Sequence, residues 1–185
     1  MQLKHTSDKI GAKIWRLSDR LVTGRIRFIL PIAIVLLGKI IGFVWLYYRM
    51  IYAFGVYAED WTEYFWGASG WDSVHYVAIA RSWYTYPSPK WAFFPAYPIL
   101  IRAFYFVFND YETSALFISN ALGIFCLPLF QRVGEEYMPR REALACTILM
   151  SLFPFTFVFM TVAYSESLFL LATLATWYLY LKDKV

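Results

Sequence analysis

Thr113–Gln131 reads TSALFISNALGIFCLPLFQ and contains no charged residue. A helix of this length comes close to crossing a hydrocarbon core of ~30 Å. A second run, Phe28–Tyr48, is apolar throughout except for Lys39. Because backbone polar groups must find their partners within the chain in a bilayer, such runs predict an all-α polytopic membrane protein.

The composition of the 185-residue chain agrees with this class. Hydrophobic residues make up 60% of the chain and aromatic residues 22%, which is more apolar surface than a soluble domain of this size needs. A net charge of +4 would suggest a nucleic-acid partner in a soluble protein. Here the basic residues flank apolar runs, so we expect them to orient the chain among membrane lipids and expect no nucleic acid.

We predict four membrane spans, and the topology follows from their positions. They are expected at residues 30–50, 113–131, 143–163 and 167–181, the last two being a helical hairpin that turns at Tyr164-Ser-Glu-Ser167. The positive-inside rule then places the N-terminus in the cytoplasm and the loop 57–112, with interfacial helices, outside. Residues 1–27 form a basic cytoplasmic segment, either an amphipathic helix on an anionic leaflet or a disordered tail, and residues 28–185 form the transmembrane domain.

Two cations interrupt the first span. Lys39 lies near its middle, where snorkelling with helix tilt is the favoured interpretation and a functional intramembrane charge is the alternative. Arg49 lies near the outer end of the span, where a lipid phosphate is one possible partner.

The segment Gly70–Pro98 carries polar residues that could take part in a reaction. A helix opening at Asp72 or Ser73 would put the carboxylate of Asp72 and the imidazole of His75 on one face. A carboxylate beside apolar surface suits a general base for a hydroxyl, whereas an N-cap role for Asp72 is the simpler alternative. The predicted topology brings Glu166, in its polar turn, to the same side of the membrane. No nucleotide loop, nucleophile elbow or metal-ligand spacing is present.

Several ordered segments carry a family resemblance. They are Trp71-Asp72-Ser-Val-His75-Tyr76, Ile79-Ala80, Phe93-Phe94-Pro95-Ala-Tyr97-Pro98-Ile-Leu-Ile-Arg102, Ser119-Asn120, Phe153-Pro154 and Ala163-Tyr164-Ser165-Glu166-Ser167-Leu168-Phe169-Leu170-Leu171. Together they resemble the GPI mannosyltransferase 2 (PIG-V) family, which belongs to the GT-C class of integral-membrane glycosyltransferases.

The resemblance implies a GT-C fold and an inverting sugar transfer from a polyprenyl- or dolichyl-phosphate donor to a glycolipid or other acceptor hydroxyl, without a further cofactor. It implies that Asp72 is the base. The site would be lined by His75, the Phe94–Pro98 segment with Tyr97, Arg102, and Ser165-Glu166. GT-C enzymes have many more spans, so we expect this chain to be an N-terminal portion or to work with a partner subunit. The membrane would be the cell membrane of a prokaryote or the endoplasmic reticulum of a eukaryote.

Two functions of other classes stay open on the residues alone. A non-catalytic membrane subunit or scaffold would dock its partner through the Trp- and Tyr-rich loop. A transporter would need charged residues along a route through the bilayer, and Lys39 is the one deep charge that the topology predicts, so this hypothesis ranks last.

Overall fold

The computed structural model describes residues 23–55, 70–85 and 89–183. Helices and no strands occur in these ranges, which confirms the predicted all-α class for this part of the chain. The elements are α2 (Ile26–Phe54), α4 (Asp72–Ser82), the 3-10 turn η1 (Pro89–Ala92), α5 (Ala96–Phe108), α6 (Tyr111–Gly134), α7 (Arg140–Leu152), α8 (Pro154–Phe159) and α9 (Glu166–Asp183). Most of the predicted basic segment 1–27 and the aromatic residues 57–69 of the predicted outer loop lie outside these ranges.

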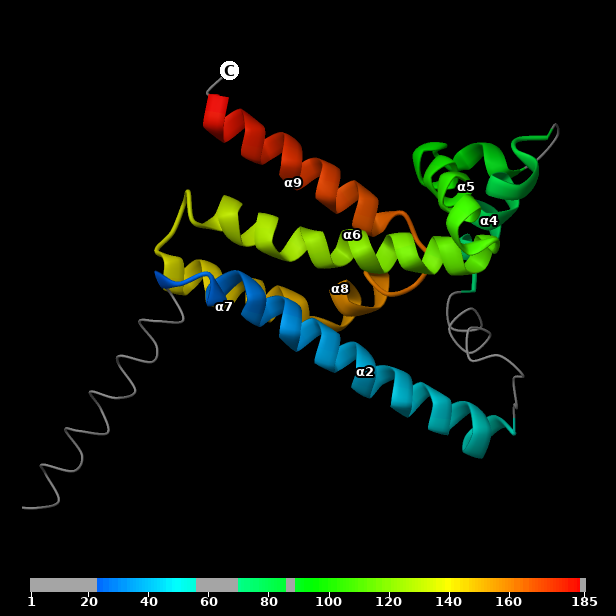
Figure 1. Ribbon diagram of the computed structural model, residues 1–185, viewed down its shortest axis with the longest axis horizontal. Helices are drawn as coiled ribbons and strands as arrows, with labels where there is room; N and C mark the ends of the chain where they lie inside the picture. The colour runs from blue at the N-terminus through cyan, green and yellow to red at the C-terminus, as the bar shows by residue number, and fades with distance from the viewer. Residues whose placement is uncertain (1–22, 56–69, 86–88, 184–185) are drawn as a thin grey trace, which may run out of the picture.

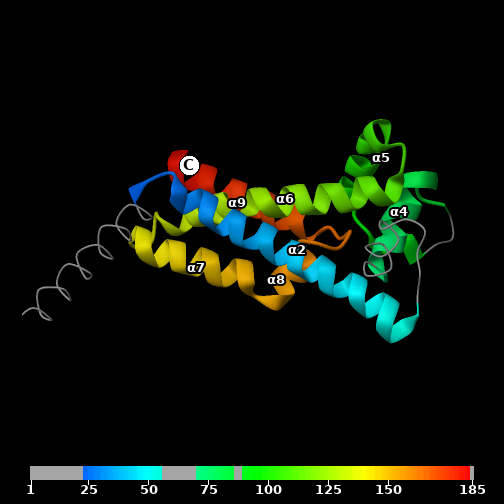
Figure 2. The same cartoon turned by 60° about the horizontal axis from the view of Figure 1, so that its bottom comes forward.

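Helix α6 is the centre of the fold. It packs against α9, α5, α2 and α7; in Figure 1 it lies between α9 and α2, and in Figure 2 it runs beside α9 above α2 and α7. Its N-terminus is capped by Asp110, whose carboxylate accepts a hydrogen bond from the backbone N–H of Thr113 at 2.7 Å. Helices α4 and α5 gather around this N-terminal end, and the other end meets the start of α7.

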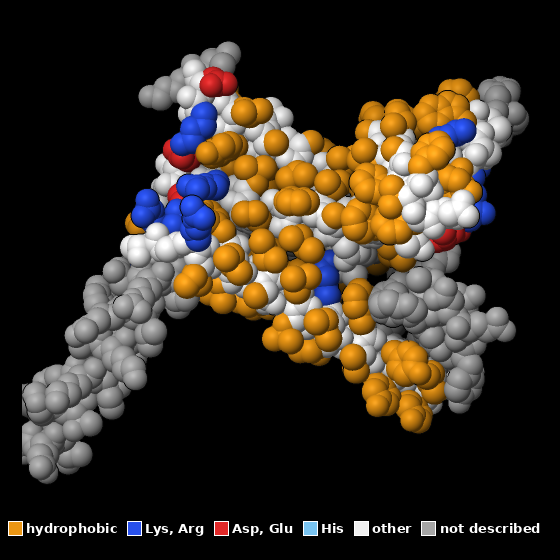
Figure 3. All heavy atoms as spheres, viewed as in Figure 1, with side chains coloured by type: hydrophobic (Ala, Val, Ile, Leu, Met, Phe, Trp, Pro, Cys, Tyr) orange, Lys and Arg blue, Asp and Glu red, His pale blue; other side chains and the backbone are white. Residues whose placement is uncertain are grey.

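Within the described ranges, two helical segments are long and apolar enough to cross a membrane. They are Ile26–Arg49 and Tyr111–Gly134, and they coincide with the first two predicted spans. Helix α7 has 13 residues and α9 has 18, so the four-span count stays a prediction. Apolar side chains cover the flanks of the bundle (Figure 3).

The third predicted span, 143–163, is not one continuous helix. Helix α7 ends at Leu152, and Phe153 has an extended backbone with φ −66° and ψ 124°. A residue before proline is kept out of the helical region by the proline ring, and Pro154 then starts α8 at a position where its missing N–H costs nothing. The chain reverses in the irregular segment 160–165, and α9 returns along α6 (Figure 1).

Charged side chains gather at the end of the bundle where α2 begins and α6 ends (Figure 3). Arg27 Nε lies 2.6 Å from Glu135 Oε1, and both side chains are buried. Lys182 Nζ lies 2.6 Å from Glu136 Oε1, which ties the end of α9 to the same region. The fold therefore has one end rich in ion pairs and an opposite end built from α4 and α5.

Candidate functional site

Helix α4 presents Asp72 at the surface of the bundle. The helix begins at Asp72, as predicted, and Trp71 occupies the N-cap position with a φ of 55°. Asp72 is therefore the first helical residue, and the alternative in which its side chain serves as the N-cap is wrong. The carboxylate is exposed and forms no hydrogen bond or ion pair with the described residues, so both of its oxygens can contact a bound molecule.

The turn between α8 and α9 lies against the first turns of α4. Ser165 Oγ is 2.7 Å from the hydroxyl oxygen of Tyr76, a buried residue of α4. Glu166 follows directly as the first residue of α9, close enough for the charge of Asp72 to act on its carboxyl group. The structure thus brings Asp72 close to the adjacent residues Ser165 and Glu166. More than half of the described residues lie between Asp72 and this pair in the chain.

Buried hydroxyl groups hold this turn from the side of the bundle interior. Tyr97 is 1% exposed, and its hydroxyl lies 2.8 Å from the carbonyl oxygen of Ala115 and 2.6 Å from Ser119 Oγ. Ser119 donates to the backbone carbonyl of Tyr164 at 2.8 Å, and the Tyr164 hydroxyl donates to the carbonyl of Gly70 at 3.3 Å. Through these bonds Tyr97 helps to join α5, α6 and the turn. A contact between Tyr97 and the substrate stays a prediction.

An aromatic cluster lies beside α4. The His75 ring stacks on Phe93 with 4.9 Å between centroids, and the Tyr76 ring meets Phe93 edge-on at 5.1 Å. Phe93 also lines a pocket of about 250 Å³ whose walls are Tyr84, Trp91, Ala92, Phe93, Phe94 and Pro95. The imidazole of His75 therefore lies against a wall of this largely apolar hollow, and Asp72 is one helical turn earlier on α4.

A comparison with known families identifies the chain at this point. Residues 47–184 match the family model Mannosyltransferase (PIG-V). The chain belongs to the PIG-V mannosyltransferase family. The match runs from the C-terminal part of α2 through α9, so it includes every element around Asp72 and Glu166. No curated protein and no solved structure matches the chain.

The two arginines predicted to bind substrate in this PIG-V family protein lie at the surface. Arg49 is exposed on α2, and its guanidinium sits 5.3 Å from the centre of the Trp45 ring. The C-terminal end of α2 points away from α4 and α5 in both views (Figures 1 and 2). Arg102 is exposed on α5, on a flank of the face that buries Tyr97. The structure does not bring either cation against the Asp72 carboxylate, and their phosphate contacts stay predictions.

Three residues that position the site belong to the segments of the family resemblance, but no role in the site was predicted for them from the sequence. Tyr76 reaches Ser165, Ser119 bonds to Tyr164, and Asn120 donates to the carbonyl of Thr161 at 2.8 Å. Ser119 and Asn120 are adjacent polar residues inside the otherwise apolar run 113–131, which is the signal that could have pointed to them. Both contribute to the site through backbone carbonyls of the same turn.

Glu166 differs from Asp72 in its electrostatic environment. Surrounding protein atoms partly desolvate the Glu166 carboxyl, and the nearby negative charge of Asp72 adds repulsion, so the pKa of Glu166 is raised above its usual value. Much of the side chain still reaches the surface, which screens both effects. Among the described residues, no three histidine, cysteine or acidic side chains converge as ligands of a metal ion would.

Replacing Glu166 with glutamine should make the PIG-V family protein more stable than the wild type as pH rises. A raised folded-state pKa means that Glu166 ionises at a cost in the folded protein, so stability is lost as pH rises through that pKa. The glutamine variant has no such loss, and its advantage should grow from about pH 4, where glutamate starts to ionise, toward pH 7. Thermal unfolding midpoints measured across this range in detergent test it.

The matched control is Glu142→Gln, which changes an exposed glutamate in the first turn of α7. Two results would contradict the view that Asp72 and local desolvation raise the pKa of Glu166. One is a difference in unfolding midpoint between Glu166→Gln and the wild type that stays constant from pH 4 to pH 7. The other is a difference that grows equally with pH for Glu142→Gln.

Proposed function

We propose that this PIG-V family protein transfers mannose from a polyprenyl- or dolichyl-phosphate donor to a hydroxyl group of a lipid-linked acceptor. The observation that carries the proposal is the exposed carboxylate of Asp72 at the start of α4, which has no bonding partner in the part of the chain that the structure describes. It faces a turn that presents a hydroxyl group, on Ser165, and a second carboxyl group, on Glu166. Family membership supports the reaction class, and this geometry supports Asp72 as the base in our proposal.

Asp72 accepts the proton of the acceptor hydroxyl in the proposed reaction. The acceptor oxygen forms a bond to the anomeric carbon while the bond from that carbon to the lipid phosphate oxygen breaks. The phosphate leaves with the bonding electrons, and the configuration at the anomeric carbon inverts. A positioned general base contributes about 10²–10⁴-fold to the rate of such a step. Glu166 and Ser165 lie where they can orient the acceptor or the sugar.

The charge distribution supports a site on the non-cytoplasmic side. Basic residues surround the end where α2 begins and α6 ends, among them Arg27, Arg132 and Lys182. The positive-inside rule assigns such an end to the cytoplasm. Asp72 lies at the other end of α6, beside α4 and α5, so it would face the outer or lumenal leaflet, where lipid-linked sugars present their headgroups.

An outer-leaflet cation would complete the site by binding the phosphate of the departing lipid. Arg102 on α5 belongs to the same end of the bundle as Asp72, and Arg49 lies near the outer end of α2. A guanidinium group can hold phosphate oxygens through two parallel hydrogen bonds. We therefore propose Arg102 or Arg49 for this contact, with no further cofactor in the transfer.

A transfer assay tests the proposal. The protein is reconstituted in liposomes with radiolabelled polyprenyl-phosphate mannose and a glycolipid acceptor, and labelled glycolipid is measured over time. We expect product from this donor and none from GDP-mannose, because the site we propose binds a lipid phosphate. Polyprenyl-phosphate glucose carries a different sugar on the same lipid phosphate, so it tests whether the transfer is specific for mannose.

A protein that binds neither donor nor acceptor and transfers no sugar would contradict the transferase. If the protein transferred no sugar but assembled with a second membrane protein through its tryptophan- and tyrosine-rich segment, the scaffold hypothesis would replace the transferase proposal.

A further inference from the structure

Lys39 is buried in the middle of the long apolar helix α2. Its side chain is held inside the bundle, where the ammonium group donates to Asn120 Oδ1 on α6 and to the backbone carbonyl of Met160 at 2.9 Å. The favoured interpretation from the sequence, snorkelling toward the membrane surface, is therefore wrong. Lys39 lies outside the part of the chain that matches the family model, residues 47–184.

The partners of Lys39 belong to the turn that carries the site. Helix α8 ends at Phe159, so the carbonyls that follow have no helical N–H group to bond. Lys39 bonds to the carbonyl of Met160, and Asn120 bonds to that of Thr161 at 2.8 Å. Side chains from α2 and α6 therefore hold the start of this turn, together with the backbone N–H groups of Met160 and Thr161, which donate to the carbonyls of Thr156 and Val158 at 2.9 Å each.

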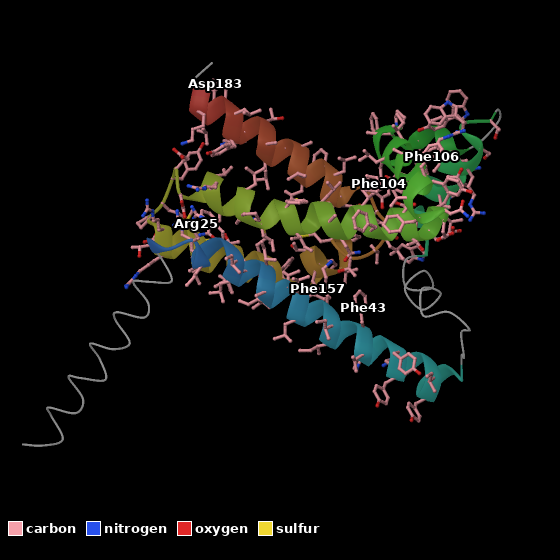
Figure 4. All side chains as sticks on the ribbon, in the orientation of Figure 1. Arg25, Phe43, Phe104, Phe106, Phe157 and Asp183 are labelled. Atoms are coloured by element: carbon pink, nitrogen blue, oxygen red, sulfur yellow. The ribbon has the colours of Figure 1, made fainter. Side chains whose placement is uncertain are left out.

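Small residues allow this close approach. The ring of Phe157 on α8 packs against Gly38 and Gly42 of α2, where added Cβ atoms would lie 3.3 Å and 3.6 Å from the ring (Figure 4). Gly123 of α6 faces Met160 at a distance that would bring an added Cβ to 2.9 Å from the Met160 Cβ. Helices α2, α6 and α8 thus meet around the Lys39 ammonium group.

The geometry points to Lys39 as a positioning residue for the transfer site, through Met160 and the turn that leads to Glu166, and this inference rests on the proposed function. Five residues after Met160, Ser165 bonds to Tyr76, and Glu166 lies under the influence of Asp72. If Lys39 releases the Met160 carbonyl, the turn can move, and Ser165 and Glu166 move away from α4. Lys39 itself touches neither substrate nor the reacting atoms.

Spin-label distances and transfer kinetics together test this role. Labels are placed at Val74 on α4 and Phe169 on α9, both exposed, after exposed Cys146 is replaced by serine; Cys126 is buried and is kept. The wild type should give a narrow distance distribution. Lys39→Met should broaden or shift it, and Lys39→Arg, which keeps a cation with hydrogen-bond donors, should largely restore it.

The transfer rate should follow the distance distribution. In Lys39→Met we expect kcat and kcat/KM to fall together by about 10–100-fold, because a displacement of about 1 Å in a catalytic group costs that much. Lys182→Met is the matched control: it also removes a lysine that binds another element, but at the opposite end of α9, and it should leave both measurements unchanged. Should Lys39→Met fail to fold, Lys39→Gln takes its place with the same expectation.

An unchanged distance distribution in Lys39→Met or Lys39→Gln would overturn the positioning role, whatever the protein's activity. A changed distribution in a protein whose wild type transfers no mannose would keep the structural role of Lys39 and refute the proposed function instead. An equal loss in Lys182→Met would show a general loss of stability and would also overturn the role.

Discussion

Asp72→Asn should lower mannosyl transfer by about 10²–10⁴-fold, the contribution of a well-placed general base. Asparagine has nearly the same shape as aspartate but cannot accept the proton of the acceptor hydroxyl. Because the Asp72 carboxylate is exposed and has no bonding partner among the described residues, its replacement breaks no contact of the fold. The variant should therefore unfold at the same temperature as the wild type or slightly above it, because it also removes the repulsion between Asp72 and Glu166. Its KM for the donor should be similar to that of the wild type.

Asp183→Asn is the matched control for this change. It makes the same substitution at an exposed residue at the end of α9, far from α4 (Figure 4). Transfer by this variant should equal that of the wild type. Normal transfer by Asp72→Asn would refute the base assignment, and if Glu166→Gln were inactive in the same assay, Glu166 would be the base.

The helices around Asp72 follow from local sequence. The apolar runs predicted α2 and α6 because a long uncharged segment has few other stable conformations in a bilayer. A helix opening at Asp72 or Ser73 was predicted, and α4 begins at the first of these two residues. The N-cap role was wrong by one residue, because Trp71 adopts a positive φ that is uncommon for a large side chain and is not predictable from residue type.

The contacts that assemble the site depend on tertiary structure. The partners of Lys39 are 81 and 121 residues away in the chain, so hydropathy could not distinguish a buried, bonded lysine from a snorkelling one. The break at Phe153 had a local signal in Pro154, but the long apolar run concealed it. The family resemblance placed Tyr97 in the lining of the site, and packing of α5 on α6 buries it, which local sequence does not reveal.

Gly123→Leu should strongly destabilise the protein and abolish transfer. At Gly123 an added Cβ would lie 2.9 Å from the Cβ and 3.2 Å from the carbonyl oxygen of Met160, and one of these neighbours is backbone that cannot rotate away. Overpacking a well-filled interior costs about 1–3 kcal/mol. Moving Met160 would also take one of two hydrogen-bond acceptors from buried Lys39, and a buried donor that loses its partner costs about 1–3 kcal/mol.

Gly123→Ala and Gly134→Ala separate packing from helix propensity. Both are in α6, and alanine favours a helix interior over glycine by about 1 kcal/mol; the gain is full at Gly123 and smaller at Gly134, the last residue of the helix. At Gly134 the new Cβ meets the Cβ of Ala143 at 3.4 Å, an ordinary contact, so Gly134→Ala should be neutral or stabilising. Gly123→Ala should be destabilising despite its larger propensity gain, and Gly123→Leu more so, in unfolding titrations with sodium dodecyl sulfate. Equal stability of the two alanine variants would mean that α6 and the turn before Glu166 are not held in close contact. The inferred positioning of Ser165 and Glu166 by Lys39 would then lose its structural basis.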